Sequence, residues 1–92
     1  MTMNEMRAKK LLTELSSILD SFYFSINALQ QNFEDGLIKA NAAKRLYRKY
    51  MKSVRHYDKI QTAIQEKYPA SANGVALVCI CSFDKFNDFF EN

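Results

Sequence analysis

Hydrophobic residues recur every three or four positions along most of the chain, which is the spacing of amphipathic helices. The clearest case is the segment 41–68. A rotation of 100° per residue places seven apolar side chains within an arc of roughly 120°: Leu46, Tyr50, Val54, Tyr57, Ile60, Ile64 and Tyr68. Tyr47 and Met51 flank this arc. Asn41 is the predicted N-cap, and Pro69 predicts the end of the helix because its ring removes a backbone donor.

The segment 3–33 shows the same period and predicts a first helix. Its apolar face contains Ala8, Leu11, Leu12, Leu15, Ile18, Leu19, Phe22, Tyr23, Ile26, Leu29 and Phe33. Thr2 and Glu5 have the spacing of a capping box, and Met1 and Met6 that of a hydrophobic staple. Phe24 falls on the polar side of this helix. It is either an isolated exposed side chain or a contact with another chain.

The third segment is harder to assign. Gly36 suits a left-handed helix end, and residues 69–74 predict a second turn. The run VALVCICSF has the composition of a buried strand, but a single strand would have no partner. We therefore expect a helix over 73–90. Its apolar face would hold Val75, Ala76, Cys79, Phe83, Phe86 and Phe90, and its first two turns are apolar all round, with Leu77, Val78, Ile80 and Cys81.

These elements predict one all-α domain over residues 1–92, a three-helix up-down bundle built on a long antiparallel hairpin with a shorter C-terminal helix. Two Gly and one Pro are too few for the many turns of a sheet protein. The short third helix would leave apolar surface uncovered, so we expect a homodimer or a complex with another helical protein. The candidate apolar interface is Phe24, Leu77, Val78 and Ile80.

Positive charge is concentrated in the second predicted helix. Residues 39–59 contain eight Lys or Arg and one acid, Asp58, which gives a local net charge of +7 against +3 for the whole chain. The residues opposite the apolar arc form a candidate binding face: Lys44, Arg45, Arg48, Lys49, Lys52, Arg55 and Lys59. Lys44 and Arg45 oppose the dipole of the helix start, so helix stability does not require them there. The face is either simply solvated or binds anions.

Catalytic and metal-binding chemistry has little support in the residues. His56, the one histidine, falls among the charged residues. Cys79 and Cys81 lie in an apolar stretch. We expect them to be reduced and buried, because a bridge closed over one intervening residue would be strained. Two cysteines and one histidine are too few for a metal site, and no Gly-rich phosphate loop is present. We therefore expect no enzyme activity, metal or cofactor.

The remaining functions are binding functions. The first hypothesis is a small regulatory or adaptor protein whose basic face meets an acidic protein surface. The alternative is contact with nucleic-acid phosphates through the same face, without sequence readout. In that case Tyr47 is the one edge-placed candidate for base stacking, since Tyr50 and Tyr57 fall in the apolar arc. Peripheral binding to an anionic membrane is a weaker third idea. No apolar run is long enough to span a membrane and no secretory signal is evident, so a soluble, cytoplasmic protein is expected.

Overall fold

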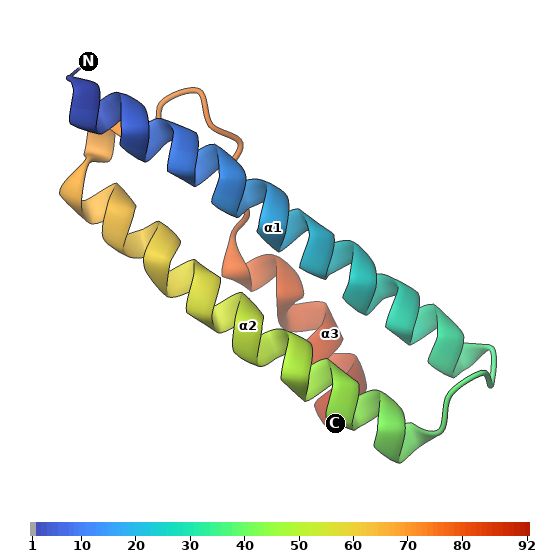
Figure 1. Ribbon diagram of the computed structural model, residues 1–92. Helices are drawn as coiled ribbons and strands as arrows, with labels where there is room; N and C mark the ends of the chain where they lie inside the picture. Colours follow the sequence, from blue (N-terminus) through green and yellow to red (C-terminus); the bar gives the residue numbers. More distant parts are fainter. Residues whose placement is uncertain (1) are drawn as a thin grey trace.

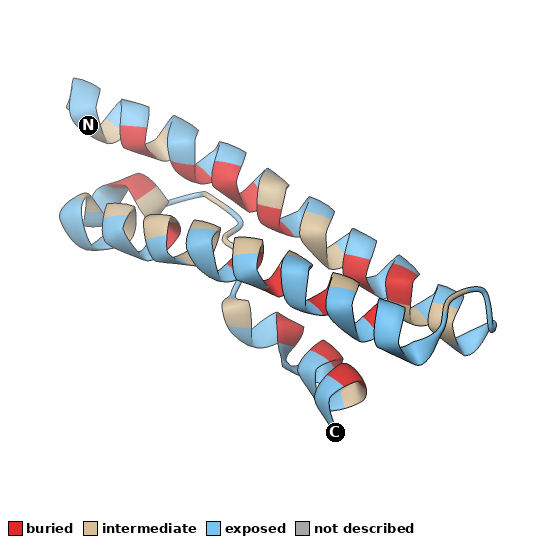
Figure 2. Cartoon of the chain, turned by 60° about the horizontal axis from the view of Figure 1, so that its bottom comes forward, coloured by how far each residue is buried: buried red, intermediate tan, exposed pale blue. Residues whose placement is uncertain are grey.

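Two long helices lie side by side, antiparallel, and form most of the molecule in the computed structural model, which describes residues 2–92 (Figure 1). They are α1 (Met3–Glu34) and α2 (Ala40–Lys67). The fold is all-α, with a third, short helix and no strand within the described residues. The molecule is elongated, with principal extents of 51 × 17 × 16 Å. Residues on the facing sides of the helices are buried, and most outward positions are exposed (Figure 2).

Local sequence signals set both ends of α1. The capping box is confirmed: the Glu5 amide donates to Thr2 Oγ1 at 3.2 Å, and the Thr2 amide donates to Glu5 Oε1 at 3.4 Å. Met1, the expected staple partner of Met6, lies outside the described residues. At the other end Gly36 takes a φ of +76°, and the Leu37 amide donates to the Asn32 carbonyl. This is the left-handed helix end predicted for Gly36.

Both ends of α2 differ by one residue from the predicted range 41–68. The helix begins at Ala40, with Lys39 rather than Asn41 in the N-cap position and without a side-chain cap. It ends at Lys67, directly before Tyr68 and Pro69, as the proline predicts. Pro69 then opens the 3₁₀ turn η1 (Pro69–Ala72), which packs at the start of α1.

The expected third helix over 73–90 is wrong for its first half. Residues 75–79 are non-helical, with Cys79 in an extended conformation (φ −79°, ψ 132°), and we call them the extended segment. They are followed by the 3₁₀ turn η2 (Ile80–Phe83) and by α3 (Asp84–Glu91). An extended chain advances about 3.3 Å per residue, against 1.5 Å in a helix. The extended segment therefore carries α3 back along the hairpin toward the α1–α2 turn (Figure 1).

That position lets α3 complete the core with aromatic side chains. Phe83 and Phe86 contact the Tyr23 ring edge-on at 5.6 and 5.1 Å, and the Phe90 ring stacks on Tyr47 at 4.6 Å. The buried hydrophobic cluster that α3 completes consists of Leu19, Ile26, Leu29, Ala43, Tyr47, Met51, Val54, Phe83, Phe86 and Phe90. These long-range contacts explain why an extended connection is favoured over a longer helix.

Because α3 also contacts α2, the buried residues of α2 are not those of the predicted apolar arc. Ala43, Tyr47, Met51, Val54 and Gln61 are buried, whereas Leu46, Tyr50 and Tyr57 are only half-buried. Tyr50 and Tyr57 instead pack against Phe22 of α1. Because α2 packs against both α1 and α3, its most buried line lies between those two neighbours.

Candidate functional site

The basic face lies along the outer side of α2. All seven of its residues are exposed: Lys44, Arg45, Arg48, Lys49, Lys52, Arg55 and Lys59. They span 15 intervals of helix, or about 22 Å at 1.5 Å per residue. His56 is exposed among them, with its ring edge-on to Tyr57. Asn41, Lys44, Arg45 and Arg48 line an open depression near the start of the helix.

One member of the basic face has an acidic partner. Arg48 donates two hydrogen bonds to Glu91 at the end of α3, from Nε to Oε1 at 2.8 Å and from Nη2 to Oε2 at 3.0 Å. The bond from Arg48 is the main cause that lowers the pKa of Glu91, and the charges of Arg48, Lys44 and Arg55 lower it further. The same contact raises the pKa of Arg48. A carboxylate is thus stabilised on this face by several cations together.

The other six cations make no ion pair with any residue of 2–92. They are Lys44, Arg45, Lys49, Lys52, Arg55 and Lys59. Their side chains extend into solvent from one side of one helix, and the positive potential between them is therefore not neutralised at close range. The sequence placed these residues on a common face correctly. It did not identify Glu91, whose position beside Arg48 depends on the path of residues 75–91.

Three of the four predicted apolar interface residues, Phe24, Leu77 and Val78, are brought together from two parts of the chain. Phe24 of α1 is 69% exposed, and it lines a shallow groove with Tyr23, Leu77 and Val78. Asp20, Cys79 and Ser82 complete the lining. Ile80 lies on the other side of the extended segment, in a second depression against Gln61, Thr62 and Gln65 of α2. We call the first depression the apolar groove. Leu77, Val78 and Ile80 are half-buried, so each leaves part of its apolar side chain uncovered.

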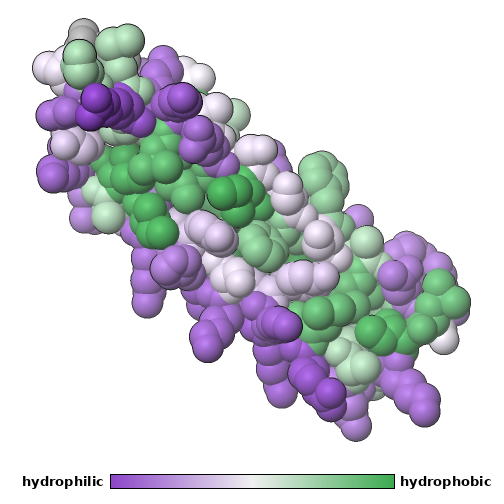
Figure 3. Space-filling view, in the orientation of Figure 1, coloured by the Kyte–Doolittle hydropathy of each residue, from purple (hydrophilic) through white to green (hydrophobic). Residues whose placement is uncertain are grey.

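Hydrophobic side chains are also exposed elsewhere. Figure 3 shows them along the seam between α1 and α2, with polar residues along the edges of the molecule. Leu11 and Leu37 are 43% and 75% exposed, and Met3 and Met6 are more than half exposed at 69% and 61%. Exposed apolar side chains are thus present near the start of α1, at Met3, Met6 and Leu11, and in the α1–α2 turn, at Leu37.

The expectation that Tyr47 lies at an exposed edge is wrong. Its ring is 1% exposed and stacks on Phe90, and its hydroxyl lies 3.2 Å from Oδ1 of Asn87. Burial is the main cause that raises the pKa of the Tyr47 hydroxyl, and the nearby charge of Arg55 offsets part of the rise. Tyr47 is a core residue and is not available to stack on a nucleic-acid base.

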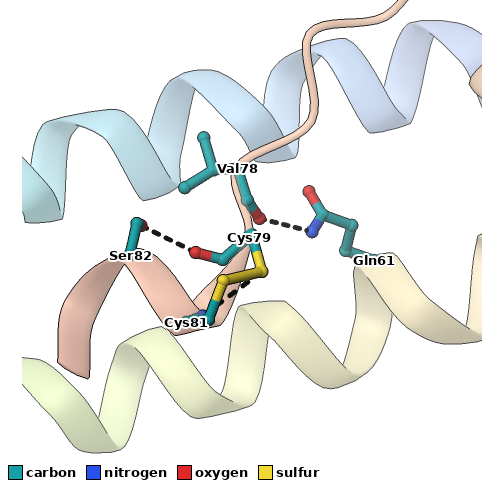
Figure 4. Close-up of a disulfide and its surroundings, with 5 residues drawn as sticks. All are labelled: Gln61, Val78, Cys79, Cys81 and Ser82. Carbon is teal, nitrogen blue, oxygen red and sulfur yellow. Dashed lines mark hydrogen bonds between the residues drawn. A yellow bond between two sulfur atoms is a disulfide. The ribbon is translucent and has the colours of Figure 1, made fainter.

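The expectation of reduced, buried cysteines is also wrong. Cys79 and Cys81 are exposed, and a disulfide joins them (Figure 4). That expectation rested on the strain of a bridge closed over one intervening residue and on the apolar character of the surrounding stretch. In the observed structure Cys79 is extended and precedes a 3₁₀ turn. The two Cα atoms are 5.2 Å apart, within the usual range for a bridge.

Gln61 is a further residue that the sequence did not single out. It is 3% exposed, and its Nε2 donates to the carbonyl of Val78 at 3.0 Å (Figure 4). This bond fixes the extended segment to α2. A signal was present in the sequence, since Gln61 is seven residues after Val54 and so shares its side of the helix.

Within residues 2–92 no three His, Cys, Asp or Glu side chains are grouped closely enough to hold a metal ion. None of the helices in this part of the chain combines the length and the apolar character that crossing a bilayer requires.

Comparison with known proteins identifies no relative. No family model matches the chain, and neither curated proteins nor solved structures give a significant match. The functional conclusion therefore rests on the surfaces described above.

Proposed function

We propose that this protein is a small, non-enzymatic regulatory or adaptor module that binds an acidic surface of another protein through the basic face of α2. The observation that carries the proposal is the row of six exposed cations without an ion-pair partner in residues 2–92. The Arg48–Glu91 contact supports the proposal, because a residue of this face there binds a carboxylate through two hydrogen bonds.

The proposed partner presents Asp or Glu side chains along a surface about 20 Å long, matched to the length of the basic face. Such complementarity accelerates association and disfavours basic partners, and its effect weakens as salt screens the charges. The apolar groove would supply a less salt-sensitive part of the contact through Phe24, Leu77 and Val78, since aromatic and aliphatic anchors contribute most where they become fully buried.

The proposal includes self-association as a homodimer, in which the hairpin and α3 act as a three-helix up-down unit. Phe24 and Leu37 are 69% and 75% exposed in the single chain, and a second copy is one way to cover such side chains. The cytoplasm is the proposed location.

Nucleic-acid binding is the alternative for the basic face. Six cations spaced over about 22 Å suit phosphate contacts. The burial of Tyr47 removes the stacking residue that the sequence offered for this function, and this favours the protein partner.

The test compares two variants with the same change in net charge. Arg45, Lys52 and Arg55 are all replaced by Glu in the first variant, which leaves the Arg48–Glu91 pair intact. Arg7, Lys10 and Lys67, exposed residues outside the basic face, are replaced by Glu in the second. Partners captured from the native host are identified and their binding is remeasured with purified components at two salt concentrations. The proposal requires that the first variant loses binding to an acidic protein and that the second retains it.

A mobility-shift assay with random duplex and single-stranded nucleic acid forms the second arm. A shift at moderate salt that only the first variant loses would favour the alternative. If both variants bind the purified protein partner like the unmodified chain, the basic face is not the binding site and the proposal is wrong.

A further inference from the structure

The disulfide between Cys79 and Cys81 encloses a single residue and lies at the surface (Figure 4). A bridge over one residue closes very little chain, so it removes little conformational freedom from the unfolded state. The stabilisation that it provides by restricting the unfolded chain is therefore small. Exposure leaves both sulfur atoms accessible to thiols in solution. These two properties are typical of a reactive disulfide and not of a structural one.

The fold holds the segment around the bridge from both sides. Before it, Gln61 Nε2 donates to the Val78 carbonyl at 3.0 Å. After it, the Cys79 carbonyl accepts from Ser82 Oγ at 2.7 Å and from the Ser82 amide at 3.0 Å. Ile80, between the two cysteines, is half-buried against α2. These contacts fix the backbone on each side of the ring, so the two thiols stay close together after reduction.

We propose that Cys79 and Cys81 form a thiol–disulfide exchange site that reacts with low-molecular-weight thiols. In the first step an external thiolate attacks one cysteine sulfur and the Cys79–Cys81 bond breaks. The attacked cysteine becomes a mixed disulfide, and the other leaves as a thiolate that takes up a proton. A second external thiolate then attacks the outer sulfur of the mixed disulfide. The products are the protein dithiol and one external disulfide, so two electrons pass from two thiols to the protein.

The geometry assigns different roles to the two cysteines. The amide of Cys81 donates to Cys79 Sγ at 3.4 Å, and such a bond stabilises a thiolate at Cys79 more than at Cys81. Cys79 is therefore the leaving group, and Cys81 is the sulfur that the external thiol attacks. In the reverse reaction the Cys79 thiolate attacks the mixed disulfide on Cys81 and closes the ring again.

The experiment uses the purified chain in glutathione buffers of varied ratio of reduced to oxidised form. Free thiols are alkylated after equilibration and counted by mass spectrometry. The control is a synthetic peptide of residues 77–83, which contains both cysteines without the fold. We expect the equilibrium constant for ring closure to be at least about tenfold larger in the protein, because the fold keeps the thiols at high effective concentration. A constant equal to that of the peptide, or two free thiols in excess oxidised glutathione, would overturn the proposal.

Two variants test whether the hydrogen bonds hold the ring. Gln61→Met removes the donor to Val78 at similar volume, and Ser82→Ala removes an exposed hydroxyl that donates to Cys79. Each should lower the closure constant by about fivefold, the effect of one ordinary hydrogen bond. Ser82→Ala covers the case in which the Gln61 variant fails to fold. If Gln61→Met and Ser82→Ala both fold and both keep the closure constant of the parent, these hydrogen bonds do not hold the two thiols together and the proposal is contradicted.

Single-cysteine variants test the direction of the reaction. With Cys81→Ser, the remaining Cys79 should be alkylated at lower pH than the Cys81 that remains in Cys79→Ser. The opposite order would overturn the role of Cys79 as leaving group.

Discussion

The guanidinium of Arg48 and the carboxylate of Glu91 join the outer side of α2 to the end of α3 through paired hydrogen bonds of 2.8 and 3.0 Å. The two residues are 43 positions apart in the chain. The contact places an acid of the protein itself at one end of the basic face. Glu91 thus neutralises one of the seven cations that an acidic partner would meet.

Glu91→Gln should strengthen binding of the chain to acidic surfaces, because it releases Arg48. We expect this variant to elute from a cation exchanger at higher salt than the parent. Asp88→Asn, which removes a charge one turn earlier at an exposed position, is the matched control. Later elution of the Glu91 variant than of the control supports the prediction. Equal elution would mean that Arg48 is no more available after the change.

The Glu91 carboxyl should titrate below the range of an ordinary glutamate, because Arg48 lowers its pKa in the folded state. Its folded-state pKa lies below its unfolded value, so the contact contributes stability above the unfolded pKa. That contribution is lost as the pH falls through the folded pKa. Carbon-detected NMR titration of the carboxyl gives the midpoint. Arg48→Gln should raise this midpoint more than Lys44→Gln does, and the reverse order would contradict the assignment of the main cause.

Two substitutions of Tyr47 separate the contribution of its hydroxyl to the free energy of unfolding from that of its ring. Tyr47→Phe removes the contact with Asn87 and should lower the free energy of unfolding by about 0.5–1.5 kcal/mol. Tyr47→Ala also removes the ring stacked on Phe90 and should lower it by about 3–5 kcal/mol. Urea denaturation measures both. A small effect of the alanine variant would place Tyr47 at the surface, as the helical wheel suggested.

Gly36→Ala should destabilise the protein by about 1–2 kcal/mol, because Gly36 has a φ of +76°. A Cβ atom at this position would meet no other atom within 4 Å, so the backbone conformation and not a clash causes the loss. Gly36→Asn should be less harmful, since Asn tolerates the left-handed region better than Ala. Thermal unfolding of the two variants checks this order. Equal stability of the alanine variant and the parent would show that the turn relaxes to a different conformation.

Self-association should depend on the exposed apolar residues. Light scattering at micromolar concentration should give a mass near twice the 10.7 kDa of the single chain. Phe24→Ser should shift the mass toward the monomer while the helical content of the chain stays unchanged, because the side chain is 69% exposed in the single chain. Thr13→Ser is the control on the same helix. A monomeric parent would end the homodimer proposal.

Most of the first two helices could be predicted from the sequence. The apolar period gave α1 and α2 within a residue or two, Thr2 and Glu5 marked the start of α1, and Gly36 and Pro69 marked helix ends. These signals act within one or two turns of chain, so they do not depend on where the rest of the chain lies. The basic face could be predicted for the same reason, since residues on one helix keep fixed angular positions.

The conformation of the last quarter of the chain depends on tertiary contacts. The run from Val75 to Phe83 is almost entirely apolar and therefore has no hydrophobic period that would distinguish a helix from an extended segment. Packing of α3 on Tyr23 and Tyr47 and the bond from Gln61 to Val78 select the extended form. The extended form changes which residues of α2 are buried. It also exposes Cys79 and Cys81 and places Glu91 beside Arg48. Each of these outcomes depends on residues far apart in sequence, whose proximity exists only in the folded chain.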